Sequence, residues 1–521
     1  MKFRNAAAVL AIVSLTTPAL AQRQPPAATT PPRTLAPAPP APPQAPSIAA
    51  DPKLAARLRA AEAWIETQLA AENVAGASMA IVHDQQIVWS RGFGYSNVAA
   101  RVPATPQTRY SICSISKLFT SMAAMRERDA GRLDIDRPLS AYLPWYNIRD
   151  VQAPDGPVTA RAIMSHVAGL PREADTPYWS EARFPDLETV RARLGEQTNL
   201  YRAYDHLQYS NLGMALLGNV VETTSGQDYH AYIRSNFLTP LGLTRTTSEI
   251  PVRMRGGELA IGYAARRTGW NREAIPAYTL NALAPAAGFA STAEDLGRFA
   301  SWQFRLLASG GENVLRSSTL REMQRVHWMT PDNPNETWGL GFGTYQHAGK
   351  TFVGHGGYCP GYRTTLMMRP QDKLAIVVLI NTDDGEPGRF ARQLYDFVGA
   401  DVVRAAAAAT PPTGPAPRPQ QPPETAGPTP AVNLAPYEGA YRTSRSAGDV
   451  YVAPYGNELM VIDLFADTPA ADITRLRHVE GDRFRVVRAN DTLAEEIRFD
   501  RNRQGRVTRI WWHSNYLDRR D

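Results

Sequence analysis

The chain has 521 residues, of which 43% are hydrophobic and 20% are charged, so it can bury a large core and form two or three domains. These proportions exclude a small disulfide scaffold, a coiled coil and a collagen-like fibre. The formal net charge is only +6 and the cations are scattered, so we expect no binding of nucleic acid.

The first 21 residues have the order of a secretory signal peptide. Lys2 and Arg4 precede the apolar run Ala6–Leu15, and the small residues Ala19 and Ala21 close the segment. We expect cleavage after Ala21 and a secreted protein, periplasmic if the host has an outer membrane. No other segment has the roughly 20 apolar residues of a membrane helix, so we expect no transmembrane segment in the mature chain.

Proline marks the boundaries that follow. Of the 42 prolines, ten lie in residues 22–50 and nine in residues 405–432. Both stretches are rich in Pro and Ala and nearly without aromatic or long aliphatic residues, so we interpret them as extended linkers. They leave two folding units, a large block at 51–404 and a small tail at 433–521.

The large block combines helices with strands from both of its ends. Apolar residues at helical spacing predict a helix over 51–71, and two β-rich runs around His83–Gln86 predict a hairpin. The middle, about 118–243, is mostly helical by pattern, whereas Phe352–Val353 and Leu374–Ile380 return to strand character. This order predicts a sheet assembled from both ends of the block, with a helical subdomain inserted.

The tail contains short runs of strand-forming residues at close spacing. These runs are Tyr437–Tyr441, Val450–Val452, Glu458–Leu464, Phe484–Val487, Glu496–Phe499 and Val507–His513. Such a series predicts a small antiparallel β-barrel of the lipocalin-like kind.

The first motif with chemical meaning is Ser114-x-x-Lys117, which apolar residues at helical spacing follow. Two side chains three residues apart at the start of a helix lie on one face, so the amine can reach the hydroxyl. A buried lysine without its proton can accept the proton of a serine and make it a nucleophile. The alternative for this pair alone is a capping serine beside a surface lysine.

The second motif is Tyr209-Ser-Asn211, at the mouth of a further apolar helix. A tyrosine beside a lysine can transfer a proton, and the amide two residues on can bind a substrate carbonyl. The same pattern begins at Tyr95 and at Tyr455, where it fits turns. Only the order of the motifs along the chain therefore selects Tyr209.

The third motif is His355-Gly356-Gly357-Tyr358, at the end of a short strand. The glycines remove side chains where a substrate backbone would lie, and free amide N–H groups there can bind an oxyanion. The alternative for this motif alone is a tight bulge beside a core histidine.

Taken in this order, the three motifs resemble those of the penicillin-recognising serine hydrolases. The tyrosine that opens the second motif favours the branch of class C β-lactamases, D-stereospecific peptidases and related esterases. His166–Pro171 and Ala287–Leu296 also look like this family, and the resemblance covers about residues 55–400. It implies an α/β (α+β) fold of the β-lactamase/transpeptidase-like type, with three layers, an antiparallel sheet and an inserted helical subdomain, here followed by the barrel.

The resemblance gives each motif a role. It makes Ser114 the acylated nucleophile, Lys117 its proton acceptor, and Tyr209 the acid/base for the leaving group and the deacylating water. The implied substrate-binding residues are Asn211, His355, Gly356, Gly357 and Tyr358. The sequence contains no His-Glu-x-x-His motif and no paired Cys-x-x-Cys motif, so we expect no metal, and we expect no other cofactor.

The resemblance also brings the two cysteines together. The N–H groups of Ser114 and Tyr358 would form the oxyanion hole, and Cys113 precedes one of these residues while Cys359 follows the other. We therefore expect a Cys113–Cys359 disulfide in an oxidising compartment. Two small buried thiols beside the site are the alternative.

The implied function is that of an exported serine hydrolase acting through an acyl-enzyme on a small amide or ester, with a D-amino-acid peptide or an acyl ester favoured. His355 stands where β-lactamases usually have lysine, and a neutral histidine offers no fixed cation for a penicillin-type carboxylate. The alternatives are a β-lactam hydrolase, a penicillin-binding DD-carboxypeptidase and a non-catalytic binding or sensing module. The expected partner is a small molecule or a short peptide.

Overall fold

The computed structural model describes most of the chain from Ile48 onward. The described ranges are 48–149, 156–266, 272–331, 333–409, 432–442, 449–470, 473–487, 493–512 and 515–520. The predicted signal peptide, most of the first linker and most of the second lie outside them. The described residues belong to one compact unit.

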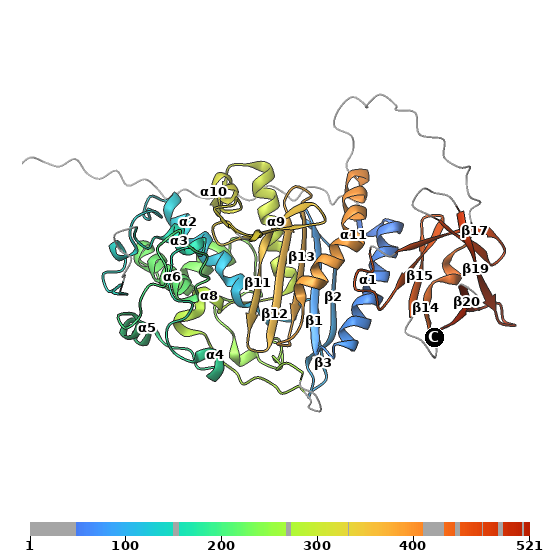
Figure 1. The fold of residues 1–521 in the computed structure, drawn as a ribbon, viewed down its shortest axis with the longest axis horizontal. Helices are drawn as coiled ribbons and strands as arrows, with labels where there is room; N and C mark the ends of the chain where they lie inside the picture. Colours follow the sequence, from blue (N-terminus) through green and yellow to red (C-terminus); the bar gives the residue numbers. More distant parts are fainter. Residues whose placement is uncertain are drawn as a thin grey trace, which may run out of the picture. The chain divides into compact units, whose positions relative to one another are not determined.

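A nine-stranded antiparallel sheet forms the centre of the large block (Figure 1). In spatial order its strands are β3 (Val102–Pro103), β2 (Gln86–Asn97), β1 (Gly76–His83), β13 (Leu374–Ile380), β12 (Tyr362–Arg369), β11 (Lys350–Cys359), β10 (Gly343–His347), β9 (Asn333–Trp338) and β8 (Trp328–Thr330). Strand β1 pairs with β13, so that Ala77 lies opposite Ile380. This pairing confirms a sheet built from both ends of the block.

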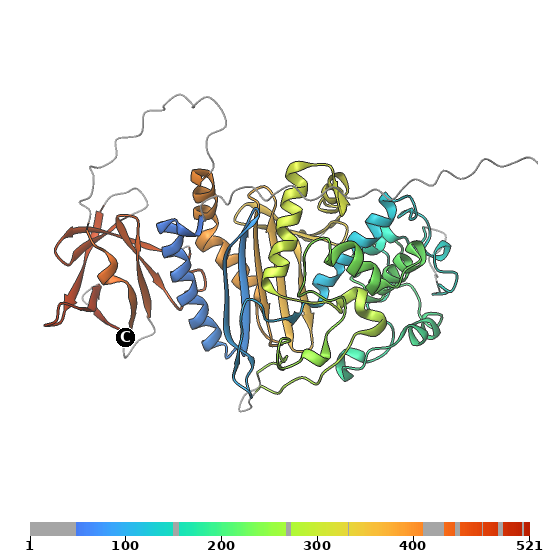
Figure 2. The same ribbon diagram turned by 180° about the vertical axis from the view of Figure 1, so that it is seen from behind.

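The two faces of the sheet are covered by different helices. Side chains alternate along β1, so Ala80 and Val82 enter one core while Met79 and Ile81 enter another. The first core contains α2 (Ser116–Asp129), α6 (Asn211–Ser225) and α9 (Ala293–Ser309), and the second contains α1 (Pro52–Ala71) and α11 (Pro387–Ala409). Figure 2 shows these layers from behind. The predicted three-layer fold with inserted helices is confirmed.

The remaining elements of the block are short. The α-helices are α3 (Ala160–Met164), α4 (Tyr178–Glu181), α5 (Leu187–Leu194), α7 (Tyr229–Ile233), α8 (Ala284–Ala287) and α10 (Ser317–Met323). Single turns are η1 (Ile48–Ala50), η2 (Cys113–Ile115), η3 (Leu139–Ala141), η5 (Arg234–Leu238), η6 (Val252–Met254) and η7 (Asn281–Leu283), and strand pairs are β4 (Tyr110–Ser111) with β5 (Ala290–Ser291) and β6 (Glu312–Asn313) with β7 (Leu315–Arg316). Within the described ranges, none of the helices is both long and apolar enough to cross a bilayer.

Both predicted linkers extend too far into the folded block. Helix α11 runs to Ala409, and Ala405 within it is buried, although 405–432 was assigned to the second linker. Turn η1 likewise folds the end of the first predicted linker, 22–50, and buries Ile48. Alanine is the best helix former, so an alanine run beside prolines can be helical where it meets a folded surface.

The tail is a closed antiparallel barrel of eight strands, as predicted in kind. The strands are β14 (Gly439–Arg442), β15 (Val450–Tyr455), β16 (Glu458–Asp463), β17 (Thr474–Glu480), β18 (Arg483–Val487), β19 (Leu493–Arg501), β20 (Val507–Trp512) and β21 (Asn515–Arg519), preceded by η8 (Ala435–Tyr437). Side chains fill its interior, among them Leu476, Phe484 and Phe499. The sequence prediction lacked β17 and β21, whose residues are mostly polar.

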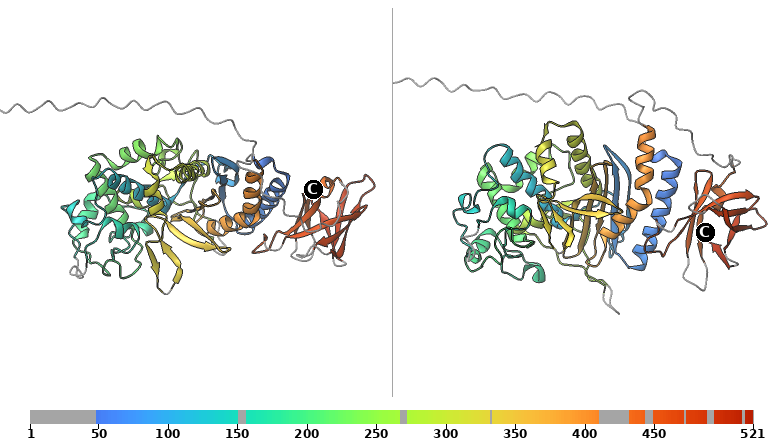
Figure 3. Two further views of the ribbon diagram at one scale, coloured as in Figure 1. Left: turned by 90° about the horizontal axis from the view of Figure 1, so that it is seen from above. Right: turned by 45° about the horizontal axis from the view of Figure 1, so that its top comes forward.

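Strand β16 joins the barrel to the large block because it buries both of its faces. Leu459 and Val461 point into the barrel, whereas Met460 and Ile462 pack in the core that contains α1 and α11. The side-chain amide of Gln68 in α1 also donates to the carbonyl of Leu464, at 3.2 Å. Figure 3 shows the barrel next to α1 and α11 from two further directions.

Replacing Ile462 by aspartate places a charge in this apolar contact. We expect the substitution to separate the unfolding of the barrel from that of the block, so that calorimetry records two transitions instead of one. The matched control is Val479→Asp, at a barrel side chain that is already 47% exposed, which should leave a single transition. A single unchanged transition in Ile462→Asp would contradict this role of β16.

Candidate active site

Ser114 lies in η2, the short turn that leads into α2. The residue before it, Cys113, has φ of 50°, a conformation that residues other than glycine adopt only when their surroundings hold them there. The hydroxyl of Ser116 donates to the carbonyl of Cys113 at 2.6 Å and accepts from the amide of Phe289 at 3.0 Å. These bonds fix the turn and, with it, the position of the Ser114 hydroxyl.

Lys117 is completely buried in the first turn of α2, with its amine beside Ser114. Its Nζ lies 3.0 Å from Ser114 Oγ, 2.8 Å from Asn211 Oδ1 and 2.8 Å from the carbonyl oxygen of Ala286. A neutral amine has two hydrogens and one lone pair. The two oxygens at 2.8 Å can accept both hydrogens, which directs the lone pair to the hydroxyl of Ser114.

Burial also favours the neutral form of this lysine. Loss of water around the amine lowers the pKa of Lys117 well below its ordinary value. The carboxylate of Glu173 raises this pKa and the guanidinium of Arg172 lowers it, but both effects are smaller than that of burial. Burial therefore favours the neutral amine, which can accept a proton.

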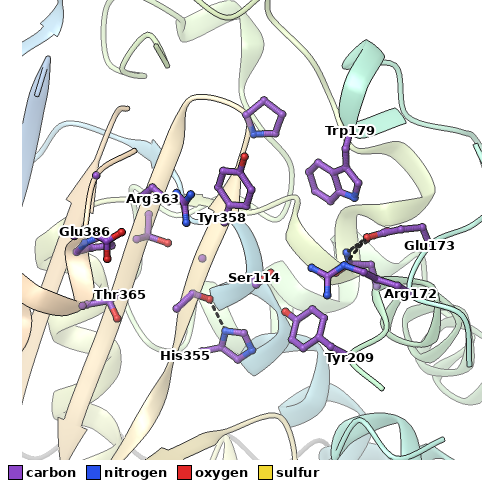
Figure 4. A pocket seen from close by; sticks show the side chains of 18 residues that line it. Ser114, Arg172, Glu173, Trp179, Tyr209, His355, Tyr358, Arg363, Thr365 and Glu386 are labelled. Atoms are coloured by element: carbon purple, nitrogen blue, oxygen red, sulfur yellow. Dashed lines mark hydrogen bonds and ion pairs between the residues drawn. The ribbon is translucent and has the colours of Figure 1, made fainter. Parts of the chain in front are cut away.

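Tyr209 lies next to Ser114, just before α6 begins, with Arg172 on its other side (Figure 4). Lys117 Nζ is 4.8 Å from the ring centroid, and the guanidinium carbon of Arg172 is 4.9 Å from it. Burial raises the pKa of Tyr209, and a hydrogen bond with Ser114 opposes this effect only in part. The phenol therefore keeps its proton and can donate it.

His166 packs against Tyr209, with ring centroids 4.1 Å apart. The imidazole is buried, and loss of water lowers its pKa well below the ordinary value, with the nearby Lys117 as the next cause. The edge of the Trp338 indole meets the same ring at 4.8 Å. These contacts make His166 part of the packing that holds the ring of Tyr209 in place.

The side chain of Asn211 lies between Lys117 and Glu173 and lines the pocket. Its Oδ1 accepts from Lys117, and its Nδ2 donates to both carboxylate oxygens of Glu173, at 2.8 and 3.1 Å. These bonds orient the lysine, and the contact of Asn211 with a substrate carbonyl stays a prediction. The sequence analysis did not identify Glu173, although it lies two residues after the family-like stretch His166–Pro171.

Strand β11 lies against the turn η2, which contains Ser114, along the edge that β10 leaves unpaired. Strand β10 pairs with β11 only as far as Gly354, so the edge from His355 to Cys359 faces η2. A Cβ atom on Gly357 would lie only 2.4 Å from the carbonyl oxygen of Ile112, which explains why glycine is needed there. A disulfide joins Cys113 to Cys359, with Cα atoms 5.6 Å apart, so the structure contains the pairing that the resemblance implied.

A pocket of about 740 Å³ opens over Ser114 (Figure 4). The residues expected from the sequence that line it are Ser114, Tyr209, Asn211, His355, Gly356, Gly357 and Tyr358, while Lys117 lies beside it under Ser114. Lining residues that the sequence analysis missed include Arg172, Glu173, Trp179, Arg363 and Glu386. In the part of the chain that the structure describes, no three His, Cys, Asp or Glu side chains are grouped so that they could hold a metal ion.

A protein-family model described as Beta-lactamase matches residues 61–401. The chain belongs to the Beta-lactamase family. Protein flp of Staphylococcus aureus (strain COL) is 25% identical over 347 residues, which are 65% of this chain and 65% of that protein, so the match spans less than two thirds of this relative. The putative beta-lactamase-like 1 of Homo sapiens is 26% identical over 84% of this chain and 85% of its own length.

Several solved structures share the fold of this chain. The octameric penicillin-binding protein homologue from Pyrococcus abyssi superposes with a TM-score of 0.58 at 22% identity, over 88% of this chain and 99% of that one. The hydrolase EstCE1, described as having promiscuous acyltransferase activity, gives 0.55 at 23% identity over 67% and 99%. A D-stereospecific amidohydrolase from Streptomyces gives 0.53 at 22% identity over 65% and 97%.

The substitution Glu173→Gln tests whether the carboxylate of Glu173 raises the pKa of Lys117. The carboxylate raises the pKa of Lys117, and its loss also leaves the cation of Arg172, which lowers that pKa, without its 3.2 Å partner. If neutral Lys117 accepts the proton of Ser114, as the resemblance implies, the acid limb of the pH profile for fluorophosphonate labelling moves to lower pH. Glu386→Gln, in the same pocket, should leave the profile unchanged. A shift to higher pH would refute the electrostatic role of Glu173.

Proposed function

We propose that this protein is an exported serine hydrolase that forms an acyl-enzyme with a small amide or ester. The observation that carries the proposal is the buried amine of Lys117, 3.0 Å from Ser114 Oγ with two other acceptors at 2.8 Å. This arrangement supplies the neutral base that a serine needs to become a nucleophile.

In the first step, Ser114 Oγ attacks the carbonyl carbon and its proton moves to Lys117 Nζ. The N–H groups of Ser114 and Tyr358 receive the oxyanion, and each such donor is worth about 2.7–4 kcal/mol in comparable sites. When the tetrahedral intermediate collapses, the phenol of Tyr209 protonates the departing nitrogen or oxygen and regains a proton from Lys117. Water then repeats the sequence on the acyl carbon, releasing the acid and restoring Ser114.

The pocket favours a peptidase or esterase over a β-lactam hydrolase. Burial, with the charge of Lys117 as the next cause, lowers the pKa of His355 to about 3, so the imidazole supplies no positive charge for a carboxylate. Relatives of the same fold are described as a hydrolase with acyltransferase activity and as a D-stereospecific amidohydrolase. We therefore propose a D-amino-acid peptide or a short acyl ester as substrate, with a β-lactam or a DD-carboxypeptidase substrate as the alternative.

The disulfide supports the proposal of export. Disulfides persist in oxidising compartments and are rare in the bacterial cytoplasm. A Cys113–Cys359 bond is therefore consistent with a signal peptide at residues 1–21 and with a periplasmic location.

A fluorophosphonate probe should label the intact protein at Ser114. We expect no labelling of Ser114→Ala, and a loss of about 10²–10⁴-fold in labelling rate for Lys117→Ala because the general base is gone. Ser309→Ala removes an exposed hydroxyl at the end of α9 and serves as the control with the normal rate. Equal labelling of Ser114→Ala and the intact protein would exclude the hydrolase and favour a binding or sensing module.

A substrate panel separates the proposed reactions. We expect short acyl esters and D-amino-acid amides to be hydrolysed with higher kcat/KM than a chromogenic cephalosporin, because the pocket lacks a cation at His355. The measurement is initial rates on the intact protein, with Ser114→Ala as the blank. Preferential hydrolysis of the cephalosporin would instead support the β-lactam hydrolase.

A further inference from the structure

One ring nitrogen of His355 is buried at the catalytic pocket without a partner. The residue is only 8% exposed, it lines the pocket, and among the described residues its Nε2 makes no hydrogen bond. Its other nitrogen, Nδ1, forms a hydrogen bond with the backbone carbonyl oxygen of Gly356. A buried polar atom left unpaired is costly, so this Nε2 indicates a group that arrives with the substrate.

The bond to Gly356 determines which role Nε2 can play. A carbonyl oxygen only accepts hydrogen bonds, so Nδ1 must carry the hydrogen. In a neutral imidazole the other nitrogen then has a lone pair and no hydrogen. The neighbours keep the ring neutral, because it is buried among Tyr209 and Trp338, at centroid distances of 6.3 and 5.5 Å, and close to the amine of Lys117.

We propose that His355 Nε2 accepts a hydrogen bond from the substrate, so that the enzyme selects amides and esters carrying an N–H or O–H donor at this wall of the pocket. The inference rests on the proposed hydrolase function and adds a specificity-determining residue to it. A substrate carboxylate at the same place would meet the lone pair and be repelled. Sites built to bind a polar substrate group strongly reject analogues that lack it, because the site then keeps an unpaired polar atom.

Matched 4-nitrophenyl esters test the proposal on the full-length protein. Each pair has the same acyl chain, one member with a hydroxyl or amide N–H on the first, second or third carbon from the carbonyl and the other with hydrogen or methyl in its place. For at least one position we expect kcat/KM to be about tenfold or more higher with the donor, which corresponds to about 1.4 kcal/mol. A mono-ester of succinate measures the response to a carboxylate.

Variants of His355 test whether this side chain causes the preference for donor-bearing esters. His355→Leu should remove the preference for the donor, so that the ratio of kcat/KM between the donor ester and its matched donor-free ester falls to about one. His355→Gln retains an acceptor oxygen and should keep part of the preference, which covers the case that the leucine variant is unstable. His355→Lys should lose the donor preference and raise kcat/KM for the succinate mono-ester about tenfold or more.

The outcomes separate this proposal from the proposed function. The fluorophosphonate needs no donor on the ligand, so its rate at Ser114 should fall less in the His355 variants than the rate with donor-bearing esters does. Equal rates within every matched pair, together with normal labelling of Ser114, would overturn the role of His355 alone. An equal loss with all esters and with the probe would show that Nε2 serves an enzyme group such as Tyr209, which also overturns it. Absence of labelling in the unaltered protein would overturn the hydrolase itself and this inference with it.

Discussion

The proposed oxyanion hole depends on the close approach of two backbones, that of η2 at Ser114 and that of β11 at Gly357. Donors of an oxyanion hole act only when they lie about 2.7–3.1 Å from the oxygen, so a small separation of these two segments would remove the effect proposed for them. Glycine allows the approach because a Cβ at position 357 would collide with Ile112. The Cys113–Cys359 disulfide ties together the same two segments, which are 246 positions apart in the chain. The missing side chain of Gly357 and the disulfide thus both keep the backbone of β11 close to that of η2.

The three motifs of the candidate site could be recognised because each is local in the sequence, whereas the side chains that contact them come from elsewhere in the fold. The three-residue spacing of Ser114 and Lys117 already places them on one helix face. Arginine, abundant in this chain, could not replace that lysine, because a guanidinium does not lose its proton in proteins. Glu173 acts on Lys117 through Asn211, a contact that exists only after the loop following Pro171 has folded over α6. No regular spacing in the sequence predicts that Glu173, Asn211 and Lys117 lie together.

The fold was predictable where apolar residues recur with a clear period, and less so elsewhere. Strand β13 is a continuous apolar run and was identified, but β17 has one fully buried apolar residue, Leu476, among charged ones. Its arginines form ion pairs with carboxylates of neighbouring strands, as Arg477 does with Glu458 at 2.8 Å. The strand is therefore stabilised by contacts between strands, which a periodic pattern of apolar residues does not reveal. Helix α11 shows the reverse, since its alanine-rich end has the composition of a linker and becomes ordered by the surface that it covers.

The double burial of β16 has a consequence for how this protein can be divided and recombined. A barrel whose outer surface was polar would be an independent domain and could be exchanged between relatives by itself. Here the outward side chains Met460 and Ile462 belong to the core of α1 and α11, while their neighbours in sequence belong to the barrel. A chimaera made at the second proline-rich segment would therefore cut through one hydrophobic core. A successful exchange has to transfer α1, α11 and the barrel together, although the two helices lie at opposite ends of the catalytic block.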